Sequence, residues 1–367
     1  MGQSSAPQEF ANSQAALQRA VPRVLEERRR RGLDGLVGGL SAIYINTEPG
    51  EQQAALAELL RYTGLDLEGV YAGPSYITGV LKTAGSADVI VRSRRGSENS
   101  FAAFNDHPKS RHLPHTRLET LLFETPDIER YVAIQQANGV AFLTAEPIRT
   151  EKYTVIQTPP SSYTGTSTAF IQWRPGCRGD RYCSDMTALD WPLRKPANSH
   201  ASRVHQLDHV TLRVRAEDRD AAILELMSLT NYDYDFSIYV ESLNSITNVT
   251  RGRHTDPAVV MTSGIRPYVD DATSGPTEKY IHNHGPRAHH IAFWTDQIEA
   301  TFAALQADGV EFLIELTGSP AEGLHQTFTQ PSPHTLLVHE YIHRYGGFTG
   351  FFTKSNVTAL TAATGKQ

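Results

Sequence analysis

Cysteine is almost absent from this chain of 367 residues, which contains only Cys177 and Cys183. Two cysteines exclude a disulfide framework, and without a second pair nearby they do not match the usual zinc clip. The sequence also lacks an apolar run long enough to span a bilayer, and its N-terminus lacks the apolar core of a secretory signal. These absences predict a cytoplasmic protein without a membrane segment.

The chain also has little excess charge of either sign. Its formal net charge is −6, with 20% charged and 40% hydrophobic residues. A weakly negative chain offers no reason to expect nucleic acid or an anionic membrane as a partner. The length and the ordinary composition predict two globular domains, each with a substantial core.

An internal repeat decides the organisation of the chain. The segment 123–143 recurs as the segment 293–313, with a constant shift of 170 positions, so that Gly139 reappears as Gly309. Phe, Thr, Ile, Glu, Ala, Gln, Val and Leu recur in register with this glycine. Such a match predicts that the second half of the chain is a duplicate of the first.

Each half divides again into two units of similar plan. Alternating apolar positions predict a strand, a helix and further strands between residues 41 and 91, and the pattern recurs over 118–174, 207–260 and 288–344. We predict an α+β fold in which four βαβββ modules pair into two open, barrel-like sheets. The expected segments are an N-terminal helix and tail (1–35), a first barrel domain (36–175), an irregular linker (176–203) and a second barrel domain (204–367).

Two histidines and a glutamate stand on three predicted strands of the second half. His209 alternates with apolar residues that face the other way, His290 lies in the strand that follows residue 287, and Glu340 interrupts an apolar run. Two histidines and one carboxylate are the usual protein ligands of a non-haem iron(II) ion, which keeps positions open for substrate and dioxygen. The alternative is that each is an ordinary strand residue. His289 also competes with His290, because alternation alone does not say which neighbour faces inward.

The duplication offers a control on this hypothesis. In the first half, the position equivalent to His290, 170 residues earlier, is Thr120. The position equivalent to His209, on the matching strand, is Ala42. The last strand of the first half contains no acid. We therefore predict one cavity that binds a metal and one that is empty.

Four further histidines are candidates of lower rank. His282 and His284 are expected in a loop near the site. His339 and His343 flank Glu340 on the opposite face of its strand, where we expect surface or interface residues.

Several motifs of the second half resemble a known family. They cover residues 207–210, 241–245, 280–285, 290–292, 326–331 and 340–348. Together they resemble the vicinal oxygen chelate superfamily, and within it 4-hydroxyphenylpyruvate dioxygenase and its relatives. The resemblance extends from residue 207 to the end of the chain and is only architectural before it. It implies that His209, His290 and Glu340 bind iron(II).

The resemblance also implies roles around the substrate. Gln326 would hydrogen-bond near a bound 2-oxo acid, Phe328 would line the pocket, and Ser245 would lie in its polar wall. The final helix would close the cavity, with Phe352 or, in another alignment, Val357 against the substrate.

The implied activity is that of an iron(II)-dependent dioxygenase, which oxidatively decarboxylates a 2-oxo acid and hydroxylates the same molecule. Ile265, Pro276 and His289 stand where the family has polar amides, so we expect a substrate other than 4-hydroxyphenylpyruvate. Two alternatives stay open: an extradiol ring-cleaving catechol dioxygenase, and a protein that only binds a small ligand. By analogy with the family, we expect a homodimer or homotetramer.

Overall fold

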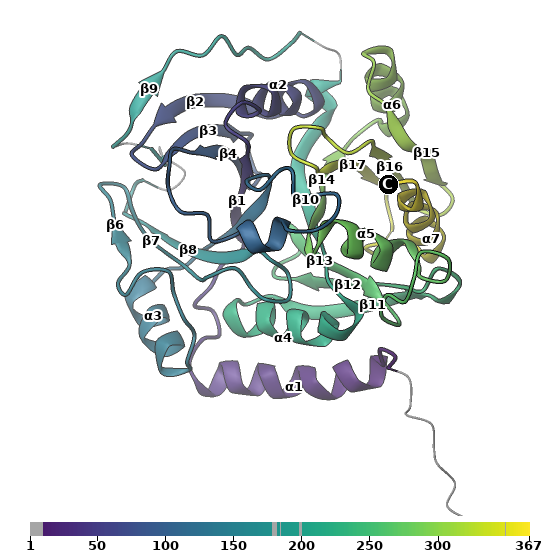
Figure 1. Cartoon of the computed structure of the whole chain (residues 1–367), viewed down its shortest axis with the longest axis horizontal. Helices are drawn as coiled ribbons and strands as arrows, with labels where there is room; N and C mark the ends of the chain where they lie inside the picture. Colours follow the sequence, from purple (N-terminus) through teal and green to yellow (C-terminus); the bar gives the residue numbers. More distant parts are fainter. Residues whose placement is uncertain (1–9, 178–181, 184, 198–199, 349) are drawn as a thin grey trace, which may run out of the picture.

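The computed structural model describes residues 10–177, 182–183, 185–197, 200–348 and 350–367. It contains two curled β-sheets side by side, with helices packed around them (Figure 1). The first sheet has nine strands and the second has eight. Among the described residues, no helix combines the length and the apolar character needed to cross a membrane.

The first half of the chain forms the first sheet. Its helices and strands are α1 (Gln14–Arg30), β1 (Leu40–Thr47), α2 (Gln52–Tyr62), β2 (Asp66–Ala72), β3 (Tyr76–Lys82), β4 (Asp88–Arg94), β5 (Arg117–Glu124), α3 (Ile128–Ala137), β6 (Ile148–Arg149), β7 (Tyr153–Gln157), β8 (Ser167–Trp173) and β9 (Thr187–Leu189). The strand order is β6-β7-β8-β5-β1-β4-β3-β2-β9.

The second half forms the second sheet. Its helices and strands are β10 (Val204–Arg213), α4 (Arg219–Leu229), β11 (Asp233–Val240), β12 (Ser245–Arg251), β13 (Ala258–Gly264), α5 (Pro276–His284), β14 (Arg287–Thr295), α6 (Ile298–Ala307), β15 (Phe312–Ser319), β16 (Leu324–Thr329), β17 (Val338–Arg344) and α7 (Lys354–Ala363). The strand order is β11-β12-β13-β10-β14-β17-β16-β15.

The two sheets are built on one plan. In each, the central pair is antiparallel, β1 with β5 and β10 with β14. Each central strand also pairs in parallel with the last strand of its own module, β4, β8, β13 or β17. The predicted four βαβββ modules are confirmed; β6 is the short counterpart of β15 in the second module, and β9 is an additional strand at the edge of the first sheet.

The alternation predicted for β10 sets the two faces of the second sheet. Val210 and Leu212 are buried in the main hydrophobic core, which joins both halves of the chain and the helices. Thr211 and Arg213 point the other way and line a cavity. Helix α1, which corresponds to the predicted N-terminal helix, lies along α4 at the base of the molecule (Figure 1).

A β-bulge occurs at the same place in both sheets. Between Thr211 and Leu212, the pairing of β10 with β14 skips one residue, His289. The pairing of β1 with β5 skips Glu119 in the same way. A bulge leaves two successive residues opposite one residue of the partner strand, which changes the direction of their side chains. The duplication therefore extends to an irregularity of the backbone.

The linker is more ordered than we predicted. Residues 187–189 form β9, which pairs with β2 at the edge of the first sheet, and residues 201–203 form a short 3-10 helix. Tyr182, Cys183 and Met186 pack with Ala42 and Ala169 in a hydrophobic cluster. The first sheet is therefore filled on this face by side chains of the chain itself, at the place where we predicted the cavity without metal. Residues 178–181, 184, 198 and 199 of the predicted linker, and 1–9 of the predicted tail, lie outside the described residues.

Candidate metal centre

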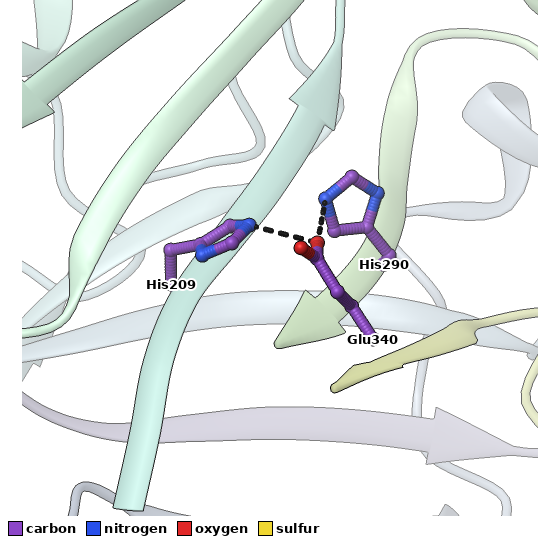
Figure 2. A group of neighbouring side chains, drawn as sticks. All are labelled: His209, His290 and Glu340. Atoms are coloured by element: carbon purple, nitrogen blue, oxygen red, sulfur yellow. Dashed lines mark ion pairs between the residues drawn. The ribbon is translucent and has the colours of Figure 1, made fainter. Parts of the chain in front are cut away.

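Three neighbouring strands bring His209, His290 and Glu340 together. Ala292 of β14 pairs with His209 of β10 on one side and with Glu340 of β17 on the other. His290 precedes Ala292 by two positions and shares its face of the strand. The Nε2 atoms of His209 and His290 lie 3.1 and 3.2 Å from Oε2 of Glu340 (Figure 2). One ligand atom from each residue lies within 4.8 Å of the others, so one cation can contact all three.

The two distances fit neighbouring positions around a metal ion. Ligand atoms about 2.1 Å from an octahedral ion and at right angles to each other are about 3.0 Å apart. His209 Nε2 is also buried without a hydrogen-bond partner, because the nearby carboxylate oxygen is not aligned to accept from it. A buried nitrogen of this kind is costly unless something binds it. The residues present therefore fit a divalent cation.

An acid behind His209 orients its ring. Nδ1 of His209 lies 2.8 Å from Oδ1 of Asp208, and Arg344 donates to both oxygens of that carboxylate, at 2.5 and 3.0 Å. A carboxylate that accepts from Nδ1 leaves the lone pair of Nε2 free for a metal. The arginine in turn holds the pKa of Asp208 well below its usual range, although burial acts in the opposite direction.

A second hydrogen-bond chain orients His290. His289 Nε2 lies 2.9 Å from the side-chain oxygen of Gln367, and its Nδ1 lies 2.8 Å from Nδ1 of His290. Burial lowers the pKa of His289 well below 6.5, so its ring is neutral and carries one proton. That proton is on Nε2, because the amide oxygen only accepts. His290 must then donate through Nδ1, which leaves its Nε2 free to face Glu340.

The protonation states follow from burial and mutual contact. Burial lowers the pKa of His209, but Glu340 and Asp208 outweigh it and raise the pKa to about 9. For His290 burial prevails and lowers the pKa to about 4. Burial raises the pKa of Glu340, but the two histidines outweigh it and lower the pKa to about 2. The acid is therefore ionised at neutral pH, and a metal ion would displace the proton of His209.

The three residues adjoin a cavity. His290 and Glu340 lie in its wall. On the side of α7, the wall is formed by Phe352, Val357 and Leu360. The site is therefore covered by apolar side chains of the C-terminal segment.

Hydrogen bonds connect this covering segment to the acid. Gln326 Nε2 donates to Oε1 of Glu340 at 2.5 Å, and Asn356 Nδ2 of α7 donates to Oε1 of Gln326 at 2.9 Å. Because Oε1 of Glu340 is occupied by the amide, Oε2 is the oxygen left for a metal. The position of the helix and the orientation of the acid are thus coupled.

Comparison with known proteins agrees with this architecture. Residues 208–328 match the Glyoxalase/Bleomycin resistance protein/Dioxygenase superfamily. The structure is similar to a triple mutant of 4-hydroxymandelate synthase from Streptomyces coelicolor, with a TM-score of 0.66 and 18% identity over 90% of this chain and 99% of the other. The chain has a two-domain vicinal oxygen chelate fold.

A second structure shares this vicinal oxygen chelate fold. It is a xylose isomerase-like TIM barrel/4-hydroxyphenylpyruvate dioxygenase fusion protein, with a TM-score of 0.57 and 16% identity over 90% of this chain. The similarity covers 52% of the fusion protein. No curated protein matches the chain in sequence.

The cavity contains most of the predicted substrate residues. Gln326, Phe328 and Phe352 line it, and so does Val357, which the sequence offered as the alternative to Phe352. Ser245 is fully buried and does not line the cavity; its hydroxyl lies 3.0 Å from that of Thr277, which does. Their roles toward a substrate stay predictions.

Other predicted positions differ from the structure. Ile265 and Pro276 do not line the cavity, whereas His289 does, because the bulge turns both neighbouring histidines toward it. His282 and His284 lie in the last turn of α5, and the prediction of a loop is wrong.

His339 and His343 lie away from the cavity. His339 is buried and contacts the ring of Tyr62 from α2, with a centroid distance of 5.4 Å, so it belongs to the interface between the two halves. His343 is half-buried, and its Nδ1 lies 2.7 Å from the carbonyl oxygen of Thr295.

Sequence reasoning missed four residues that shape the site: Asp208, Arg213, Arg344 and Asn356. The acid could have been found, since it directly precedes His209 and a carboxylate often orients a ligand histidine. Arg213 shares the strand face of His209, which the alternation showed. The other two are brought to the site by tertiary packing alone.

Proposed function

We propose that this protein is an iron(II)-dependent dioxygenase that oxidatively decarboxylates a 2-oxo acid and hydroxylates the same molecule. The observation that carries the proposal is the meeting of His209 Nε2, His290 Nε2 and Glu340 Oε2 beside a covered cavity. Two imidazoles and a carboxylate suit iron(II) and leave positions for a chelating substrate and dioxygen. The names of the two structures with this fold, a 4-hydroxymandelate synthase and a 4-hydroxyphenylpyruvate dioxygenase fusion, support the same class.

The overall reaction balances within one substrate. Iron(II) held by His209, His290 and Glu340 would supply the redox chemistry between the bound oxo acid and dioxygen. Loss of carbon dioxide and oxidation of one C–H bond each provide two electrons, which together reduce dioxygen. One of its oxygen atoms ends in the new carboxylate and the other in the hydroxyl group, so no second oxo acid is consumed.

The protein's own residues hold and enclose the reacting groups. Asp208 and His289 fix the two histidine rings, and Gln326 fixes the carboxylate of Glu340. Phe328 and Phe352 add apolar surface that excludes water from the cavity. We further propose that residues 204–367 form the catalytic domain, that residues 36–175 form a structural domain, and that the chain assembles as a homodimer or homotetramer.

The test is oxygen uptake together with carbon dioxide release by protein loaded with iron(II). One panel of substrates contains aryl and aliphatic 2-oxo acids, and the other contains catechols. We expect uptake coupled to decarboxylation of an oxo acid. In His290→Ala and Glu340→Gln, iron affinity and turnover should fall by more than about 100-fold, beyond the loss typical of an outer partner of a ligand.

The matched control is His339→Ala, which removes a buried histidine from the same strand as Glu340 but outside the cavity. It should leave iron affinity unchanged. Uptake with catechols alone would replace the proposal by ring cleavage. A wild-type protein that binds no iron would reduce the function to ligand binding.

A further inference from the structure

Two buried arginines, Arg94 and Arg213, have Nε and Nη1 atoms without an acceptor, but Arg94 forms an ion pair with Glu119 whereas Arg213 forms none among the described residues. Arg213 is 4% exposed, and its Nε and Nη1 atoms are buried without a hydrogen-bond acceptor. Arg117, Arg219 and Arg287 are as deeply buried, but each donates hydrogen bonds to oxygen atoms of the protein. A guanidinium cannot lose its charge at physiological pH, so its burial without a partner is unfavourable. Arg213 is therefore placed for an acceptor that the chain itself does not provide.

This arginine lines the same cavity as the candidate metal ligands. It follows His209 by four positions on β10, which places the two backbones about 13 Å apart along the strand. Its guanidinium lies over the ring of Tyr280, 4.3 Å from the centroid. The ring supports the cation on one face and leaves its in-plane N–H groups free. The cavity thus has metal ligands in one region and a fixed cation in another.

Two hydroxyl groups without partners accompany the arginine. The Oγ1 atoms of Thr211 and Thr262 are buried and make no hydrogen bond. Thr262 is paired with Arg213 across β13 and β10, and Thr211 precedes it by two positions on the same face of β10. Both threonines line the cavity. A guanidinium with adjacent hydroxyls is a typical set of donors for a carboxylate.

The chain offers little negative charge to balance this set. Among the residues that the structure describes, no carboxylate forms an ion pair with Arg213; the acid that acts on it most is Glu278. The Oε1 atom of Glu278 accepts from the backbone N–H of Gly264 at 2.8 Å, and burial raises its pKa to about 7. The missing negative charge must come from the ligand.

We propose that the substrate carries a second anionic oxygen group, in the simplest case a carboxylate, which Arg213 binds while the 2-oxo acid lies at the metal ligands. This inference rests on the proposed function, because that function places the 2-oxo acid end of the substrate at the metal ligands. Thr211 and Thr262 would donate to the same group. Arg213 is then the residue that selects acidic 2-oxo acids over neutral ones.

The test compares matched pairs of ligands that differ in this one group. Protein loaded with iron(II) is titrated calorimetrically without oxygen, with 2-oxoadipate against 2-oxohexanoate and with 4-carboxyphenylpyruvate against phenylpyruvate. We expect at least one pair to favour the dianion by about 10- to 100-fold, the range for hydrogen bonds to charged groups. Arg213→Met should abolish the preference, and Arg213→Lys should keep part of it.

Controls separate this inference from the proposed function and from misfolding. Iron affinity without any oxo acid should be the same in wild type and Arg213→Met, whose loss of an unpaired buried charge should not impair folding. Equal affinity within both pairs, or a preference that survives in Arg213→Met, overturns the inference even if oxygen is consumed. If the preference for the dianion depends on Arg213 but no oxo acid is turned over, the inference is supported and the proposed dioxygenase function is overturned. If iron does not bind, the same titrations of metal-free protein decide on Arg213 alone.

Discussion

Both sheets bury a glutamate, and the two acids have different partners. In the first sheet Glu119, at the bulge of β5, lies 3.2 Å from Arg92 and 2.6 Å from Arg94. In the second sheet Glu340 faces His209 and His290. Arginine keeps its charge at any physiological pH, whereas a neutral imidazole is a metal ligand. The first sheet therefore balances its acid with permanent charges, and the second balances it with imidazoles that can exchange a proton for a metal ion.

The positions that correspond to the candidate ligands explain why, among the described residues, one half alone has a candidate metal site. Leu122 pairs with Ala42 and with Ala169 in the first sheet, as Ala292 pairs with His209 and with Glu340 in the second. Two alanines cannot bind a metal, and aromatic side chains of the linker and of β7 and β8 fill the space above them. The same backbone thus supports a hydrophobic cluster in one half and a polar cavity in the other.

The largest contrast is expected between Glu119→Gln and Glu340→Gln in metal-free protein. The first change leaves two arginines without their carboxylate, which should lower the free energy of unfolding by about 3–5 kcal/mol. The second leaves histidines that can lose their protons, so its cost should be clearly smaller. Urea unfolding monitored by circular dichroism measures both. Equal losses would contradict the view that the two acids are balanced in different ways.

Glu278 adds a third case, a buried acid held by a backbone N–H instead of a cation. Burial raises its pKa from 4.5 to about 7, so the folded state binds the proton more tightly than the unfolded state. Stability should therefore fall as pH rises from about 4.5 to about 7, by on the order of 3 kcal/mol at most. The difference in unfolding free energy between wild type and Glu278→Gln, measured across this range, isolates the effect. A difference that does not change with pH would show that the group is ionised throughout.

The smallest effect is expected from Asp208, the acid behind the candidate metal ligand His209. Asp208→Asn removes the charge that orients His209, and loss of such a partner typically lowers metal affinity by about 10- to 100-fold. Titration with iron(II) under anaerobic conditions measures it. The matched control is Asp88→Asn, an acid of the first sheet that accepts from Tyr182 and lies far from the site in the fold. An unchanged affinity in Asp208→Asn would mean that packing alone fixes the ring.

Local sequence patterns predicted much of this structure, because the modules repeat and their strands alternate regularly. The four modules follow from the duplication, and the face of His209 follows from period two. The bulge at His289 could not be predicted from one strand, since it exists only in the pairing of β10 with β14. For this reason strand alternation predicted that either His289 or His290 faces the cavity, whereas in the structure both do.

Long-range packing accounts for the rest of what the sequence did not reveal. Tyr182 fills the first sheet from a segment that looked irregular, because its Pro and Gly residues say nothing about where its aromatic side chains pack. Ser245 carries a family motif but lies behind Thr277. Motifs predict residue types at a site more reliably than they predict which atoms reach its surface.

The hydrogen bonds from Asn356 through Gln326 to Glu340 connect the position of α7 over the cavity with the orientation of a candidate metal ligand. Helix α7 cannot swing outward without giving up its bond to the amide, and the amide is what holds the carboxylate in place. In the proposed enzyme, an outward movement of α7 that admitted a substrate would therefore also loosen the carboxylate of Glu340. A chelator would compete best for the metal in that open state. A bound substrate that keeps α7 in its closed position would protect the ion. Substrate-free protein would therefore lose its iron faster than substrate-bound protein.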